Sequence, residues 1–157
     1  YVDLRSANQF IQEGHVAGFI NVPFYGLLVK TDADAFGLFT MTKVVNDQGQ
    51  VIANYGGIGS FIPRYAESVS IIKYLFPMDQ PMLVLSTAGV ESQYLLNLLL
   101  QLGYDGTLLY NVGNFSNSLG TFTAYRLREA ARFLVKGHDA YQVHVDYDFG
   151  TLTPLVP

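Results

Sequence analysis

The stretch Pro81-Met82-Leu83-Val84-Leu85-Ser86-Thr87-Ala88-Gly89-Val90-Glu91-Ser92 decides the fold of this 157-residue chain. Its first five residues form a continuous apolar run, which predicts a strand buried on both faces of a parallel sheet. From Ser92 onward polar residues fall four apart, and leucines occupy most of the remaining circumference. This pattern predicts a helix that is mostly buried. Strand, tight loop and helix in this order indicate an α/β fold.

The loop between this strand and helix has the features of an anion site. If it curls around Ser86, its backbone amides and the positive end of the helix dipole surround one point. Gly89 can supply the positive φ that such a tight loop needs. The predicted anion-binding loop consists of Ser86, Thr87, Ala88, Gly89, Val90, Glu91 and Ser92.

Two further motifs accompany this loop. Val2-Asp3-Leu4-Arg5-Ser6 precedes Gly14-His15-Val16-Ala17-Gly18-Phe19-Ile20-Asn21-Val22-Pro23, and Leu102-Gly103-Tyr104 precedes Leu109-Tyr110-Asn111-Val112-Gly113-Asn114. Together they resemble the D-x-R … G-H-I-x-G-A-x-N-I-P signature, the C-x-x-G-x-R-S loop and the following segment of rhodanese-like domains. The resemblance covers residues 1 to about 28 and about 81 to 114, well under half of the chain.

The resemblance implies a three-layer α/β/α domain with a parallel central sheet, right-handed crossovers and helices on both sides. It implies that position 86 is that of a catalytic cysteine, which takes a sulfane sulfur from thiosulfate or a similar donor and passes it on as a persulfide. It implies that His15 is a fold-stabilising hydrogen bonder. Asp3 and Arg5 alternate on the first strand, so we expect them to share a face and pair.

Ser86 departs from the family at the reacting atom. A cysteine thiol has a pKa of about 8.5, which amides and a helix N-terminus can lower, whereas a serine hydroxyl is far harder to ionise. Oxygen also cannot hold a sulfane sulfur in a stable sulfur–sulfur bond. Glu91 stands where the family often has an arginine, and its carboxylate would fill the anion site or repel a donor.

These departures favour a domain of sulfurtransferase ancestry that cannot form a persulfide. We expect it to bind a small anion such as thiosulfate or sulfate at the loop, or a protein partner, and to need no cofactor. The alternative is an active thiosulfate-type sulfurtransferase whose catalytic cysteine was changed to Ser86. A weaker option, phosphoryl chemistry, also requires a thiolate. In the plainest interpretation Ser86 only ends a strand and caps the next helix, because the G-x-S-x-G motif of serine nucleophiles is absent.

Composition limits the classes of fold and function that remain. Half of the residues are apolar, which is enough for one domain with a real core. The net charge of −4 gives no support for nucleic-acid binding. The chain has no cysteine, so disulfides, thiolate metal sites and thiol redox chemistry are excluded. No apolar run approaches the roughly 18 residues of a membrane helix, so we expect a soluble domain with no membrane span.

The beginning of the chain also departs from the resemblance. Residues 1–157 are expected to form a single rhodanese-like domain that lacks the N-terminal strand and helix preceding D-x-R. Tyr1 does not begin a signal-peptide pattern. We therefore expect the chain to be part of a longer protein, whose front could carry a secretion or lipid-anchor signal.

Several segments lie outside the motifs. The pattern predicts a β-hairpin insert over 39–55 around the turn 46–49, a glycine-rich connector over 56–60 and a helix over 65–76 that Pro77 stops. After a loop over 115–120, it predicts a helix over 124–136 and an additional C-terminal strand over 141–149.

Three polar residues of the last predicted strand, His144, Asp146 and Asp148, share one face. Side chains two apart on a strand lie roughly 6 to 7 Å from each other, too far for all three to reach one ion unaided. We therefore expect an acidic solvent face there and no metal site.

Overall fold

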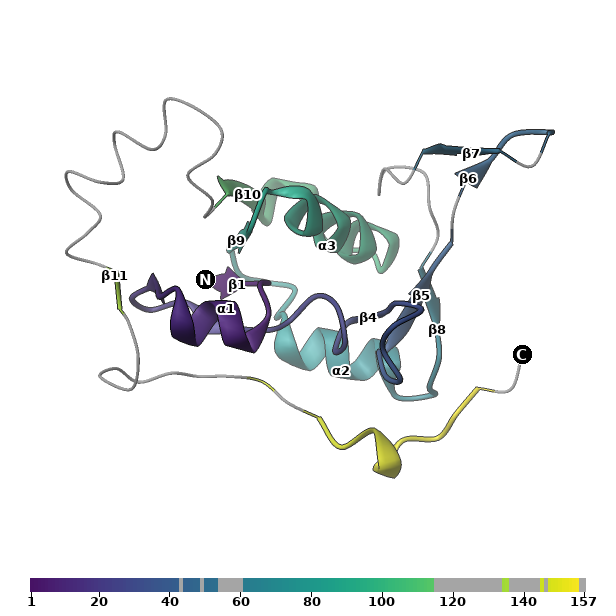
Figure 1. The fold of residues 1–157 in the computed structure, drawn as a ribbon, viewed down its shortest axis with the longest axis horizontal. Helices are drawn as coiled ribbons and strands as arrows, with labels where there is room; N and C mark the ends of the chain where they lie inside the picture. Colours follow the sequence, from purple (N-terminus) through teal and green to yellow (C-terminus); the bar gives the residue numbers. More distant parts are fainter. Residues whose placement is uncertain are drawn as a thin grey trace.

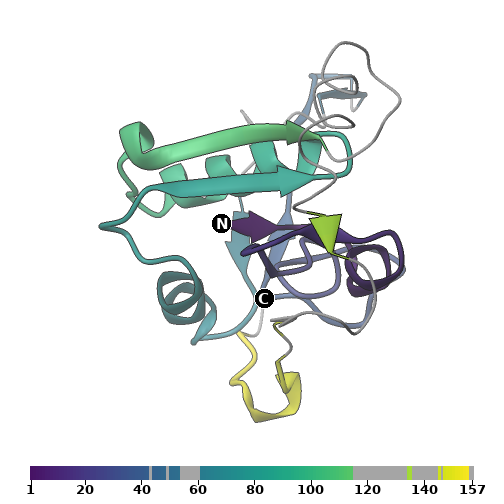
Figure 2. The same cartoon turned by 90° about the vertical axis from the view of Figure 1, so that its left-hand side faces the viewer.

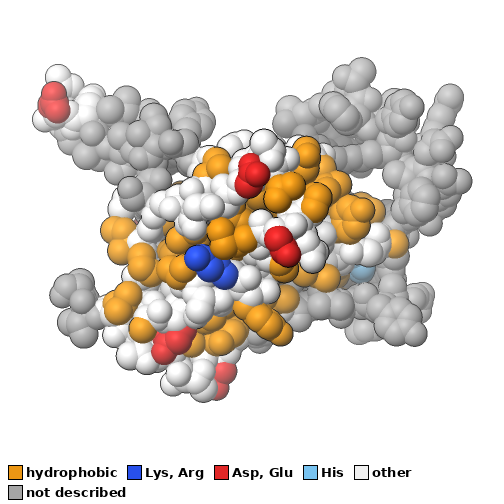
Figure 3. All heavy atoms as spheres, turned by 180° about the vertical axis from the view of Figure 1, so that it is seen from behind, with side chains coloured by type: hydrophobic (Ala, Val, Ile, Leu, Met, Phe, Trp, Pro, Cys, Tyr) orange, Lys and Arg blue, Asp and Glu red, His pale blue; other side chains and the backbone are white. Residues whose placement is uncertain are grey.

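A computed structural model describes residues 1–42, 44–48, 50–53, 61–114, 134–135, 145 and 147–155. These residues form a mixed α/β structure with a four-stranded parallel sheet and three α-helices (Figure 1). In the described residues, no helix combines the length and the apolar character that crossing a bilayer would require. On the face in Figure 3, charges of both signs are scattered among apolar side chains.

The parallel sheet has the strand order β10-β9-β1-β3. Its strands are β1 (Val2–Asp3), β3 (Ile20–Asn21), β9 (Met82–Ser86) and β10 (Leu109–Asn114). The predicted strand is therefore β9, and it lies between β10 and β1 (Figure 2). Four of its five side chains are buried, as expected for the apolar run. Asp3 lies opposite Leu85 in the register, which places the ends of β1 and β9 side by side.

Three helices accompany the sheet: α1 (Ala7–Gln12), α2 (Ser68–Leu75) and α3 (Val90–Gln101). In α1 the Ser6 side chain accepts from the Gln9 amide, and the Gln9 side chain accepts from the Ser6 amide, which forms a capping box. The leucines of α3 pack it against β9 and β10, and the helix begins at Val90, two residues before the predicted start. In Figure 1, α3 lies above α1 and α2.

A second, three-stranded sheet occupies the middle of the chain. It contains β4 (Val29–Lys30), β5 (Phe39–Met41) and β8 (Phe61–Pro63), with β5 between the other two. Within the described residues, the predicted hairpin contains β6 (Val44–Val45) and β7 (Val51–Ala53), which pair antiparallel. The first predicted arm splits because the fully buried Phe39 belongs to the core, so β5 pairs with β4 and β8 instead.

The two predictions for the C-terminal third are wrong where the structure describes them. Leu134–Val135, predicted as the end of a helix, forms β11 and pairs antiparallel with β2 (His15–Val16), so strand pairing overrides the helical pattern. Val145, Tyr147 and Asp148 are not in a strand, and Phe149–Thr151 is a 3-10 turn. The Phe149 ring stacks on the Phe36 ring at 5.2 Å between centroids. Phe149 is therefore held by aromatic packing and not by pairing between strands.

Other predictions fall outside the described residues. These are the glycine-rich connector 56–60, the loop 115–120, residues 124–133 and 136 of the predicted helix, residues 141–144 and 146 of the predicted strand, and with them His144 and Asp146. Of the three polar residues on the predicted strand face, only Asp148 is described, and its carboxylate accepts from the Gly150 amide.

The end of α3 is joined to both neighbouring parts of the fold. The Gln101 side chain accepts from the Phe61 amide and donates to the Phe61 carbonyl, each at 2.8 Å. Shortly after the helix, the Tyr104 hydroxyl donates to the Phe76 carbonyl at the end of α2. Burial raises the pKa of Tyr104 to about 12, so this hydroxyl stays protonated at neutral pH. These contacts fix the second sheet and α2 against α3.

Substitution of Gln101 by leucine is expected to lower the free energy of unfolding by about 1–3 kcal/mol, because two hydrogen bonds are lost. Hydrogen exchange of the Phe61 amide should accelerate, and the urea midpoint should fall. The matched control is Gln93→Leu on the same helix. Gln93 is exposed, and its side chain donates to Asn97 one turn further along, so its loss should cost only about 0.2–0.5 kcal/mol. Equal effects of the two variants would contradict the anchoring role of Gln101.

Candidate functional site

A buried ion pair lies at the carboxyl end of β1. Arg5 Nη2 is 2.7 Å from Asp3 Oδ2 and Arg5 Nε is 3.1 Å from Asp3 Oδ1, and both side chains are fully buried. Arg5 Nη2 also donates to the Gly14 carbonyl at 2.8 Å. Asp3 and Arg5, predicted to share a face, thus pair directly and connect β1 to the turn that follows α1.

His15 lies next to this turn and is almost fully buried. Its Nδ1 is 3.1 Å from the Phe10 carbonyl oxygen, and its ring stacks on the Phe10 ring at 3.7 Å between centroids. Both contacts are with α1, so the geometry gives His15 a packing role in the fold.

Asn21 was not singled out from the sequence, although it is the polar residue of the two-residue strand β3. It is fully buried, and its Nδ2 donates to the carbonyl oxygens of Asp3 and Arg5. A buried amide that satisfies two backbone carbonyls fixes the path of the chain where β1 ends. Its position two residues before Pro23 of the N-terminal motif was the available signal.

Ser86 is the last residue of β9 and is only 1% exposed. Its Oγ accepts the Gly89 amide at 2.9 Å and the Ser92 amide at 3.4 Å. The loop is shorter than predicted, because only Thr87, Ala88 and Gly89 separate β9 from α3. The backbone amides therefore converge on position 86, and the atom at their centre is the serine's own hydroxyl oxygen.

Gly89 makes this turn possible with a φ of +81°, as its position in the sequence predicted. The turn is also held from the neighbouring strand, because Asn111 Nδ2 donates to the Gly89 carbonyl at 3.0 Å. Sequence reasoning missed Asn111, which stands within the quoted segment 109–114. Its contact joins β10 to the start of α3.

The other predicted loop residues differ in exposure. Ala88 and Val90 are exposed and Thr87 is half-buried, whereas Ser92 is fully buried. The buried Ser92 Oγ has no hydrogen-bond partner among the described residues, although its amide is bonded to Ser86.

Glu91 lies in the first turn of α3, where a negative charge is favoured by the helix dipole. Its Oε2 is buried and has no hydrogen-bond partner among the described residues. Burial first, and then the negative charges of Glu91 and Tyr94, raise the pKa of Tyr25.

Three aromatic rings pack together where the segment after Pro23 meets α3. Phe24 contacts Tyr25 edge-on at 5.0 Å between centroids and lies 6.0 Å from the Tyr94 ring. Tyr25 is 42% exposed, while Phe24 and Tyr94 are buried. Tyr25 was missed from the sequence, where its only signal is that it follows Phe24 at the end of the N-terminal motif.

Chemically, this site offers a buried hydroxyl, a carboxylate and a phenol. The described residues contain no group of three His, Cys, Asp or Glu side chains that could hold a metal ion. Comparisons of the chain with protein-family models, with curated proteins and with solved structures find no match.

Proposed function

We propose that this chain is a rhodanese-like domain that does not transfer sulfur and acts as a binding module, with a protein partner favoured over a small anion. The observation that carries the proposal is the position of Ser86 Oγ, which accepts the Gly89 and Ser92 amides at the centre of the loop. This is where the resemblance puts a catalytic sulfur.

The arrangement of the motifs supports the proposed ancestry. Asp3 and Leu85 are partners in the register of a parallel sheet, so the two motifs meet at the carboxyl ends of adjacent strands. In open α/β sheets ligands bind at this edge. The loop after β9 lies at this edge of the sheet, which supports the proposal.

The chemistry of the residues argues against sulfur transfer. The reaction needs a thiolate that attacks the sulfane sulfur of thiosulfate, forms a sulfur–sulfur bond and releases sulfite. A hydroxyl oxygen cannot store sulfur in this way. Ser86 is also 1% exposed, so its hydroxyl is shielded from a donor in solution.

Two features also weaken the loop as an anion site. The Gly89 and Ser92 amides already donate to Ser86, which leaves fewer donors for a bound ion. A helix N-terminus is equivalent to about half a positive charge, whereas the Glu91 carboxylate supplies a full negative charge. The balance of these two charges is negative, which favours a protein partner over thiosulfate or sulfate.

One observation favours the alternative of an active sulfurtransferase with cysteine at position 86. The two amides already point at the side-chain atom of this residue, and amide donors at a helix N-terminus lower the pKa of a thiol. A cysteine placed there would therefore meet an environment that stabilises a thiolate.

Thiocyanate production from thiosulfate and cyanide separates these functions. The unaltered chain and Ser86→Ala are both expected to be inactive, and Ser86→Cys is expected to gain turnover only when combined with Glu91→Arg, which restores a cation for the donor. Turnover by Ser86→Cys alone would favour the active-enzyme alternative. Robust turnover by the unaltered chain that Ser86→Ala abolishes would refute the proposal.

A further inference from the structure

Residues 148–155, called the terminal segment below, lie on the outside of the fold. In Figures 1 and 2 this segment, drawn in yellow, runs along the lower edge of the molecule, outside both sheets. Phe149 and Leu152 are buried, and its other residues are exposed. Its 3-10 turn is formed locally, because the Asp148 carboxylate accepts the Gly150 amide. A turn that is formed locally can be carried along when the segment moves as a unit.

The main chain of the terminal segment pairs with the stretch between β8 and α2. The Ala66 amide donates to the Thr153 carbonyl at 3.0 Å, and the Leu155 amide donates to the Arg64 carbonyl at 2.8 Å. The Thr153 amide donates to the Glu67 carboxylate at 3.0 Å, and this bond lowers the pKa of Glu67. The terminal segment thus adds to the end of β8 as an extended peptide adds to a strand.

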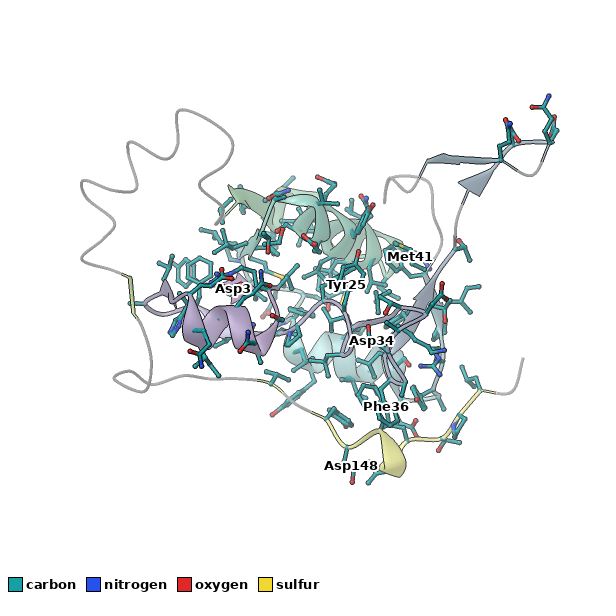
Figure 4. The ribbon with its side chains drawn as sticks, in the orientation of Figure 1. Asp3, Tyr25, Asp34, Phe36, Met41 and Asp148 are labelled. Carbon is teal, nitrogen blue, oxygen red and sulfur yellow. The ribbon has the colours of Figure 1, made fainter. Side chains whose placement is uncertain are left out.

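Two buried side chains anchor the terminal segment. The Phe149 ring stacks on the Phe36 ring at 5.2 Å between centroids and lies 5.8 Å from the Tyr65 ring. Figure 4 shows Phe36 beside the turn that follows Asp148. Leu152 belongs to the hydrophobic core and is 8% exposed. Main-chain pairing supplies affinity and side-chain pockets supply specificity, which is how grooves recognise extended peptides.

The contacts described above are all made by residues 148–155, so they do not depend on which chain supplies the segment. Residues 115–147 connect β10 to it. Just before it, the Val145 amide donates to the Asn21 carbonyl at 2.9 Å. The terminal segment can therefore leave its place while Val145 stays bound to β3.

We propose that the groove formed by Phe36 and residues 64–67 binds the terminal segment of a second copy of this chain in place of its own. Such an exchange reuses the contacts of the monomer and needs no new interface. The second copy is the partner that carries the sequence which fits this groove.

The tethered segment competes with any segment from outside. Its effective concentration is of the order of mM for a short flexible connection. The unaltered chain is therefore expected to be a monomer at low concentration and to exchange segments as its concentration approaches this range. Weakening the chain's own segment should shift the exchange to lower concentrations.

Two complementary variants of the full chain test the exchange. Leu152→Asp places a charge on a buried anchor, so this chain offers a vacated groove and a segment that cannot dock. Ala66→Pro removes an amide donor from the groove, so this chain offers an intact segment and a defective groove. Analytical ultracentrifugation is expected to show monomers of each variant alone and a heterodimer in their mixture. A mixture that contains no heterodimer would overturn the inference.

A milder variant makes the test independent of the stability of Leu152→Asp. Leu155→Pro keeps both anchors and removes the amide that donates to Arg64. A fluorescent peptide with the sequence of residues 147–155 should bind this variant several-fold more tightly than the unaltered chain, because one hydrogen bond of the competing segment is lost. Fluorescence anisotropy measures the affinity.

Two controls accompany the peptide. Leu155→Ala keeps the amide and removes only a side chain that is 47% exposed, so its affinity should equal that of the unaltered chain. A peptide with alanine in place of Phe149 and Leu152 should not bind. Equal affinity of Leu155→Pro and Leu155→Ala, or equal binding of the two peptides, would overturn the inference.

The exchange is independent of sulfur transfer. A chain that is inactive with thiosulfate and does not exchange its segment would refute the exchange and leave the proposed function intact. An unaltered chain that produces thiocyanate would refute the proposed function, whether or not it forms an exchanged dimer.

Discussion

Replacement of Arg5 by methionine is expected to lower the free energy of unfolding by about 3–5 kcal/mol, the usual loss when one partner of a buried ion pair is removed. Methionine fills much of the space of the arginine stem but leaves the fully buried Asp3 carboxylate without its cation. The carbonyl oxygen of Gly14 loses its donor as well. Urea denaturation followed by circular dichroism measures the loss as a lower midpoint.

Two control variants distinguish the effect of the buried Asp3–Arg5 ion pair on stability from the effect of changing a charge elsewhere. Glu13 is 55% exposed at the side chain and lies 3.5 Å from Arg5 Nη1, so Glu13→Gln should change stability by only about 0–1 kcal/mol. The double variant Asp3→Leu with Arg5→Met removes both buried charges and should recover part of the loss. If Arg5→Met were no more harmful than Glu13→Gln, the pair would not stabilise the fold.

The parts of this fold that could be predicted from the sequence depend on neighbours in the chain. The apolar run of β9 and the leucines of α3 have periodicities that local sequence reveals. Asp3 and Arg5 are two residues apart, so their closeness in the sequence brings them together, with Arg5 in the bend just after β1. Gly89 follows in the same way from the tightness of one turn.

The parts that failed depend on contacts between distant segments. β5 was predicted to continue into the hairpin, but its partner is β8, some twenty residues further along. Phe149 belongs to a pattern that alternates like a strand, yet it lies in a 3-10 turn and its ring stacks on Phe36, which is distant in the sequence. The periodicity of a segment does not reveal which distant segment it packs against. That partner depends on which apolar surfaces are still exposed when the core forms.

In the candidate site, too, residues from one stretch of the sequence were predicted and residues from distant parts of the chain were missed. Ser86 and Glu91 were found because they break a motif in one stretch of the sequence. Asn111 comes from another part of the chain, and only the fold brings it to the start of α3. The fold likewise packs Phe24, which contacts Tyr25, against Tyr94 of α3. The motif therefore located the loop, whereas the charge and aromatic character of its rim depend on the tertiary structure.

Replacement of Gly37 by alanine is expected to lower the free energy of unfolding by at least about 3 kcal/mol, at the upper end of what overpacking produces. Gly37 has a φ of +153°, and a Cβ placed there would lie 2.3 Å from the Lys30 amide nitrogen and 2.7 Å from the Val29 carbonyl carbon. Both atoms belong to the backbone of β4, so they cannot rotate away as a side chain would. The strand must therefore move and lose its pairing with β5.

Gly103→Ala is the matched control for this substitution. Gly103 has a φ of +88°, and an added Cβ would meet no atom within 4 Å, so its variant measures the strain of a positive φ alone, about 1–2 kcal/mol. The displacement in Gly37→Ala should also reach the candidate site, because Val29 forms a β-bridge with Tyr25 and accepts the Gly26 amide. We therefore expect Gly37→Ala, but not Gly103→Ala, to shift the NMR signals of Tyr25 under conditions where both variants are folded. Equal losses of stability in the two variants would show that β4 yields to the added methyl group.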